Sequence, residues 1–200
     1  MIKLLKTTIV ALFLSIATTP LMAGSGDFSG PYFSLQGAVV GGALDGEHVD
    51  EDGATTQGTG GTTFPIAGME AGWNIGLGNT FLIGIGATYN PGSATISNAD
   101  DAANAADVRV KISNQWTAFI QPQISFAENS AAYLKFGISE ASIDCVGDIN
   151  SKSCNNEGGL DGRTYAIGTK TKFASGIYIQ TEAGATGFES VNITNIGGSA

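Results

Sequence analysis

The residues of this chain that enzyme chemistry ordinarily requires are few and poorly placed for catalysis. His48 is the only histidine, and it lies in the acidic, glycine-containing stretch GEHVDEDG. A serine nucleophile needs a base beside it, and no serine in the alternating segments described below has a candidate base on the same face. We therefore expect that the protein is not an enzyme and that it uses no cofactor.

The two cysteines, Cys145 and Cys154, are separated by eight residues. In an oxidising compartment this pair predicts a disulfide that closes a short loop, with a contribution of roughly 2–3 kcal/mol. A metal site would need further ligands, and His48 belongs to a different part of the chain. We expect a disulfide here and no metal.

Acidic side chains gather in three long polar stretches and could bridge a divalent cation. The motif EDG at 51–53 lacks the regular ligand spacing of a calcium loop, so a solvated acidic surface is favoured. These residues are Asp45, Glu47, Asp50, Glu51, Asp52, Asp100, Asp101, Asp107, Asp144, Asp148, Glu157 and Asp161.

A last set of ionisable and amide side chains alternates with apolar ones. Such a row predicts a polar network that fills the interior of a narrow closed barrel. An alternative is a narrow, slightly anion-preferring conduit. The residues expected inside are Glu70, Arg109, Lys111, Gln115, Gln121, Gln123, Lys135, Lys170, Lys172 and Glu182.

The segment that positions several of these residues spans 108–126. Every second residue from Val108 to Phe126 is apolar, except Asn114, and the residues between are almost all polar. This is the period of a β-strand. A typical strand has five or six residues, whereas a tilted strand needs about nine to eleven to cross a bilayer. The nineteen-residue pattern therefore predicts that the apolar row faces lipid.

The N-terminus resembles a secretory leader. Lys3 and Lys6 precede an apolar run at 9–16, and 21–23 (LMA) is an acceptable cleavage site. We expect residues 1–23 to be a signal peptide and 24–200 a single domain. That domain has seven basic and eighteen acidic residues, hence a formal charge of 7 − 18 = −11, which argues against nucleic acid as a partner. It has no apolar run long enough for a spanning helix, so only a closed barrel would place it in a membrane.

Seven strands are predicted, at 31–41, 64–76, 80–90, 108–126, 132–141, 163–173 and 177–188. Long connections (42–62, 91–107, 142–161) alternate with short turns, as in outer-membrane barrels. Aromatic residues beside the turns predict a periplasmic girdle of Phe81, Phe126, Tyr133, Phe173 and Tyr178. Phe64, Tyr89 and Tyr165 are expected to form the outer one. The fold class is all-β, an antiparallel up-and-down transmembrane barrel.

The opening FSGPYFSLQG, the glycine-interrupted strands and the loop rhythm resemble the small eight-stranded outer-membrane barrel proteins of the opacity and surface-antigen group, over residues 28–190. The resemblance implies a membrane barrel with variable surface loops and usually no enzymatic activity. Family members end in a strand that closes on an aromatic residue, whereas this chain ends ESVNITNIGGSA. We therefore expect seven of eight strands, with the last strand missing.

The function expected is that of a non-enzymatic integral barrel of the bacterial outer membrane, with a structural or surface-interaction role. Its partners would be outer-membrane lipid and lipopolysaccharide, the barrel insertion machinery, and a host or environmental ligand of the loops. Two alternatives are a narrow pore for small solutes and a soluble exported ligand-binding barrel.

Overall fold

The structure is a computed structural model, and it describes residues 2–18, 28–49, 55–97, 109–149, 152–189 and 192–193. Within strands, side chains are described for 28–43, 61–95, 111–144 and 159–189. The described chain is all-β. No described helix is long and apolar enough to cross a membrane. The strands are β1 (Ile2–Thr18), β2 (Gly30–Val49), β3 (Thr55–Leu77), β4 (Phe81–Ser97), β5 (Arg109–Ala127), β6 (Ser130–Ile149), β7 (Lys152–Lys172), β8 (Ile177–Phe188) and β9 (Asn192–Ile193).

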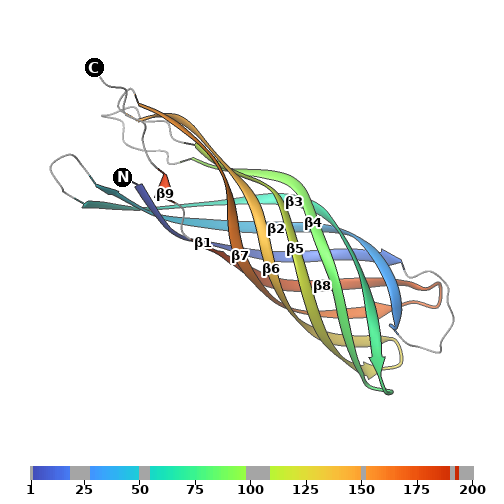
Figure 1. Cartoon of the computed structure of the whole chain (residues 1–200). Coiled ribbons are helices and arrows are strands. Elements are labelled where there is room, and N and C mark those ends of the chain that lie inside the picture. The colour runs from blue at the N-terminus through green and yellow to red at the C-terminus, as the bar shows by residue number, and fades with distance from the viewer. Residues whose placement is uncertain are drawn as a thin grey trace.

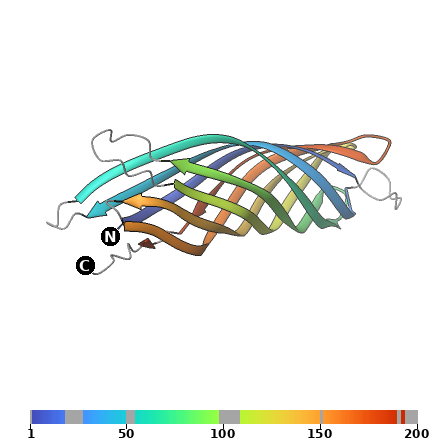
Figure 2. The ribbon, with the colours of Figure 1, turned by 90° about the horizontal axis from the view of Figure 1, so that it is seen from above.

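Strands β2 to β8 form an antiparallel up-and-down sheet in which each strand pairs with the next. The sheet twists and curls strongly (Figures 1 and 2). Short turns join β3 to β4, β5 to β6 and β7 to β8 at one end, called the turn end below. The opposite end, where β2, β4 and β6 finish, is called the loop end.

Strand β1 pairs with both β2 and β8, so that backbone pairing continues round the whole sheet. Leu14, for example, is paired with Gly37 on one side and with Thr181 on the other. The edges of β2 and β8, which a barrel without its eighth strand would leave unpaired, are therefore covered by residues of the expected leader. Its Ile2 end pairs with His48 at the loop end, where β9 also pairs with it. Removal of residues 1–23 stays a prediction, as does a missing last strand.

All seven predicted strands are present, and their turn ends lie within two residues of the prediction. The predicted loops are wrong over 42–49, 55–62, 91–97, 142–149 and 152–161, because the strands continue through these residues. In β2 and β3 the ladder runs without interruption to Val49 and Thr55. This pairing satisfies the backbone polar groups of a glycine- and threonine-rich stretch that has no apolar alternation to announce a strand. The remaining loop residues lie outside the described part.

The alternation of faces is interrupted in β5. Register shifts against both neighbours fall between Ser113 and Trp116, and Asn114 has a left-handed φ of 53°. Against β6, β5 has one extra residue between these positions, a β-bulge that reverses the faces of the residues beyond it. Ile112 is consequently buried, whereas Lys111 is exposed. The prediction that Lys111 lies in the interior is wrong for this reason, and the side chain of Arg109 lies outside the described residues.

The interior contains two apolar clusters. Near the turn end Phe28, Tyr32, Leu82, Phe119, Ala131 and Tyr178 pack together. Near the loop end the cluster consists of Ala38, Val40, Ile112, Ala141, Ile143, Leu160 and Phe188, with Phe64 and Ile66 packed against it. A polar network lies between them.

Candidate functional site

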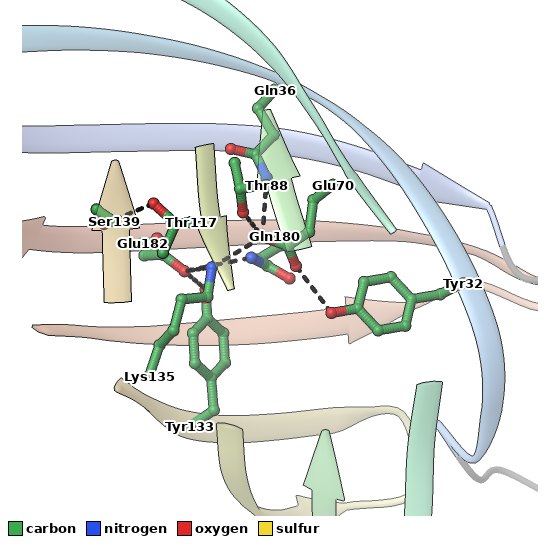
Figure 3. A network of polar contacts seen from close by, with 10 residues as sticks. All are labelled: Tyr32, Gln36, Glu70, Thr88, Thr117, Tyr133, Lys135, Ser139, Gln180 and Glu182. Carbon is green, nitrogen blue, oxygen red and sulfur yellow. Dashed lines mark hydrogen bonds and ion pairs between the residues drawn. The ribbon is translucent and has the colours of Figure 1, made fainter. Parts of the chain in front are cut away.

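Glu70 of β3 is at the centre of the interior network and is fully buried. Its Oε1 accepts a hydrogen bond from the Tyr32 hydroxyl at 2.9 Å. Its Oε2 accepts from Gln36 Nε2 at 2.9 Å and from Thr88 Oγ1 at 3.1 Å. Figure 3 shows these side chains, which come from β2, β3 and β4, directed toward one carboxylate. The buried charge is thus supplied with several donors, as a desolvated carboxylate requires.

Lys135 of β6 joins this carboxylate to a second one across the interior. Its Nζ lies 2.8 Å from Glu70 Oε2 and 2.5 Å from Glu182 Oε2 (Figure 3). Glu182 Oε2 also accepts from the Tyr133 hydroxyl at 2.7 Å. The ion-pair network therefore ties β3, β6 and β8 together through side chains alone.

Lys170 is the second buried ammonium, and it has no hydrogen-bond acceptor among the described residues. Its Nζ lies instead 4.9 Å from the ring centroid of Tyr32, 5.1 Å from that of Tyr133 and 5.6 Å from that of Tyr178. The faces of aromatic rings attract a cation, most strongly where water is absent. The buried side chains Glu70, Glu182, Lys135 and Lys170 carry two charges of each sign, so this part of the interior has no formal net charge.

Next to the ion pairs, hydroxyl groups form a chain across four strands. Ser139 Oγ lies 2.8 Å from Thr117 Oγ1 and 2.6 Å from Thr164 Oγ1, which in turn lies 2.7 Å from Thr186 Oγ1. Nearer the turn end, Asn74 donates to the Phe28 carbonyl and accepts from Gln123 Nε2 at 2.6 Å. The interior is crowded by polar groups on several levels.

Glycines face the large interior side chains. A Cβ at Gly72 would lie 2.8 Å from Cε1 of Tyr32, and one at Gly168 would overlap the ring of Tyr133. These positions need glycine because the tyrosine rings occupy the space of a side chain. The abundance of glycine in the sequence thus follows in part from a filled interior.

The cavities in this interior are small. One of about 30 Å³ is lined by Lys135, Glu182 and the threonines of the hydroxyl chain, among others. A second of about 30 Å³ lies among Val40, Phe64, Ile66 and Asn90. Each has room for no more than a few water molecules.

The structure places most of the predicted interior residues inside the sheet. Glu70, Gln121, Lys135, Lys170 and Glu182 are buried, and Gln123 is buried with them. Gln115 is half-buried and lines both cavities, and Lys172 is half-buried near the turn end.

Sequence reasoning missed the tyrosines of the network. Tyr133 and Tyr178 were expected in the periplasmic girdle, but both are buried in the interior. Tyr133 is on the same face as Lys135, and Tyr178 on the same face as Glu182, so their parity along the strands already carried the signal. In the interior the Tyr133 hydroxyl donates to Glu182, and the ring of Tyr178 lies beside the Lys170 ammonium. Phe64, expected in the outer girdle, packs against the loop-end cluster.

The outer surface is strongly apolar over part of its height. The exposed large apolar side chains, called the apolar belt below, are Phe33, Leu35, Val39, Met69, Trp73, Ile75, Leu77, Phe81, Ile85, Tyr89, Trp116, Ile120, Ile124, Phe126, Leu134, Phe136, Ile138, Tyr165, Ile167, Phe173, Ile177 and Ile179. Phe81, Phe126 and Phe173 mark its margin at the turn end. Tyr89, Trp116 and Tyr165 mark the other margin, where Trp116 Nε1 donates to Glu140 Oε2 at 3.0 Å.

The cysteines and most of the acidic residues in the described part of the chain lie toward the loop end. Cys145 pairs with Asn156, and Cys154 pairs with Gly147, so the two cysteines are two register positions apart. That diagonal corresponds to roughly 7–8 Å, more than a disulfide spans without backbone movement. The disulfide stays a prediction, and it would require a register change at this end of the β6–β7 hairpin. No group of three metal-binding side chains occurs within the described residues.

Comparison with known proteins adds no relative. The chain matches no protein-family model, no curated protein and no solved structure.

Proposed function

We propose that the protein is a non-enzymatic integral barrel of the bacterial outer membrane, of the eight-stranded opacity and surface-antigen type, that holds acidic loops at the cell surface. The observation that carries this proposal is the apolar belt on the outside of a sheet whose interior holds ion pairs. In a soluble protein these two environments are exchanged. A monomer in water rarely exposes contiguous apolar patches larger than a few hundred Å².

The height of the belt supports a bilayer as its partner. From Phe126 to Trp116 the belt extends over ten residue steps along β5, and from Phe81 to Tyr89 over eight residue steps along β4. At about 3.3 Å per residue and a tilt of about 40°, these lengths correspond to roughly 20–25 Å. The apolar band of outer-membrane barrels is about 25 Å tall. Outer-membrane lipid and lipopolysaccharide would surround the belt, and the barrel insertion machinery would deliver the chain to it.

The filled interior supports a structural or surface-interaction role over conduction. Lys135 bridges two carboxylates, on β3 and β8, and the tyrosines and glutamines around it leave cavities of about 30 Å³. An ion would have to displace this network to pass. The acidic side chains near the loop end, such as Asp161, would instead meet a host or environmental ligand.

The experiment that tests the proposal is fractionation of the full chain with a heat-modifiability gel. We expect recovery only with detergent, and a folded band that migrates differently from the boiled band. Ile85→Arg, which places a charge in the belt, should reduce the folded band, whereas Thr95→Arg on the same strand should leave it unchanged. Recovery in the soluble periplasmic fraction would contradict the membrane proposal and favour a soluble ligand-binding barrel. Conductance in planar bilayers would contradict the sealed interior and favour a narrow pore.

A further inference from the structure

The outer surface changes character at the margin marked by Tyr89 and Trp116. Toward the loop end, Val39 on β2 is the last exposed large apolar side chain among the described residues. The exposed positions there are instead polar or small, and they include Thr63, Pro65, Ser93, Thr95, Lys111, Glu140, Ser142, Asp161, Arg163 and Glu189. We call this part of β2–β8 the loop half and the part that carries the apolar belt the turn half.

At the same level the interior changes from polar and charged side chains to apolar ones toward the loop end. On β3 the inward row runs from Glu70 to Ile66 and Phe64, and on β6 it runs from Lys135 to Ile143. The same change leads to Phe188 on β8. The loop half therefore has an apolar core and a polar surface, which is the arrangement of a protein in water.

Strand β5 reaches the same arrangement by a different route. Its apolar row continues from Phe126 through Ile112 without a change of residue type, apart from Asn114. The bulge at Asn114 turns that row inward, so that Ile112 joins the loop-half core and Lys111 is exposed. On β3, β6 and β8 the inward row changes from polar to apolar residues, whereas on β5 the bulge turns an unchanged apolar row from the outside to the inside. Two independent devices thus produce one boundary at one level.

We propose that the lipid-contacting surface ends at this level, and that the loop half stands outside the outer leaflet as a water-facing barrel with its own core. This inference rests on the proposed membrane insertion and adds where the bilayer ends. The partner of the turn half is the hydrocarbon of the membrane. The collar of Tyr89, Trp116 and Tyr165, with the Trp116–Glu140 hydrogen bond, would contact the head-group region, where amphipathic aromatic rings are favoured.

The two tryptophans of the chain provide a depth gauge for this boundary. Trp73 is four residues from the turn end of β3, whereas Trp116 is eleven residues from the turn end of β5. Both are partly exposed on the outer surface. With about 3.3 Å per residue and a tilt of about 40°, the seven-residue difference places Trp116 roughly 15–20 Å farther along the barrel axis. Trp73 would lie near the bilayer centre and Trp116 at its outer margin.

The test uses the full chain as Trp73→Phe and Trp116→Phe variants, each with one remaining tryptophan, in bilayers of phosphatidylcholine brominated either near the head group or near the chain end. We expect Trp73 to be quenched more by the deep bromine and Trp116 more by the shallow one. Emission of Trp116 should also be shifted to the red relative to that of Trp73. Trp73→Tyr and Trp116→Tyr repeat the measurement if a phenylalanine variant does not insert.

Three results would overturn the inference in distinguishable ways. Deep quenching of both tryptophans would mean that the bilayer extends past Trp116, and the membrane proposal would survive without the boundary. Deep quenching of Trp116 alone would reverse the orientation assigned to the two halves. Absence of quenching at both positions would contradict the membrane proposal itself.

Discussion

The turn half and the loop half of this barrel share one backbone ladder and arrange their side chains in opposite ways. In the turn half, ion pairs and tyrosine hydroxyls fill the interior while isoleucine, leucine and phenylalanine cover the outside. In the loop half, isoleucine and phenylalanine fill the interior while charged and small residues cover the outside. Closed antiparallel pairing satisfies the backbone groups equally in lipid and in water. The comparison shows that one pattern of backbone pairing is compatible with either arrangement of apolar and polar faces, and the proposed lipid and water surroundings account for the difference.

The largest expected effect comes from removal of the central ammonium of the turn half. Lys135→Met leaves Glu70 and Glu182 buried without their shared cation, and the free energy of unfolding should fall by about 3–5 kcal/mol. Urea unfolding in detergent micelles measures the change. Lys111→Met, at an exposed position of the loop half, should change it by less than about 0.5 kcal/mol. Adding Glu70→Gln and Glu182→Gln to Lys135→Met should restore part of the loss, and a further loss would contradict the ion-pair account.

The next effect separates the two outer surfaces. Ile85→Arg, in the middle of the apolar belt on β4, should destabilise the barrel in bilayers by about 2–4 kcal/mol. Thr95→Arg, exposed on the same strand in the loop half, should cost close to nothing, because water solvates the new charge. Unfolding titrations in lipid vesicles measure both variants. Equal costs would show that the two surfaces meet the same medium.

A smaller effect compares a core position of the loop half with a belt position of the turn half on the same strand, β6. Ile143→Ala removes a buried side chain of the loop-half core and should cost about 2 kcal/mol. Ile138→Ala, on the belt of the same strand, should cost less in detergent, since lipid or detergent fills the space left by the side chain. The difference in urea midpoint between the variants measures the asymmetry. A larger loss of stability for Ile138→Ala than for Ile143→Ala would contradict the assignment of Ile143 to the core and of Ile138 to the outer surface.

The smallest effect concerns the residue that joins the halves on β5. Asn114 has a left-handed φ of 53°, a conformation that costs a β-branched residue roughly 1–2 kcal/mol. Asn114→Val should be destabilised by about this amount, whereas Asn114→Gly should stay near the wild-type value. Thermal unfolding in detergent compares the two. Tolerance of valine would mean that β5 has no bulge at this position.

Much of the turn half could be predicted from the sequence, because period-two alternation determines which residues share a face. Glu70, Lys135 and Glu182 were placed in the interior on that basis, and the structure buries all three. Their ion pairing could not be predicted, because it crosses the interior and joins strands that are not adjacent in the sheet. The loop half escaped prediction for two physical reasons. Its glycine- and threonine-rich stretches lack apolar alternation, and the bulge leaves the apolar row intact while it exchanges the faces.

One detail of that row carried usable information. Asn114 is the only polar member of an otherwise apolar row of ten residues. Asparagine tolerates the left-handed region better than other non-glycine residues, so a lone asparagine in such a row is itself a sign of a bulge. With it, the exposed position of Lys111 would have followed from parity. The same parity assigns the interior positions of Tyr133 and Tyr178.

The bulge at Asn114 also has a consequence for how this barrel can change. Because the extra residue resets the alternation of β5, the positions on its two sides need not stay in phase. Residues on the loop side can be added, removed or exchanged without imposing a new parity on those of the apolar belt. The boundary is therefore a natural place to graft a foreign peptide or to divide the protein into its turn half and its loop half.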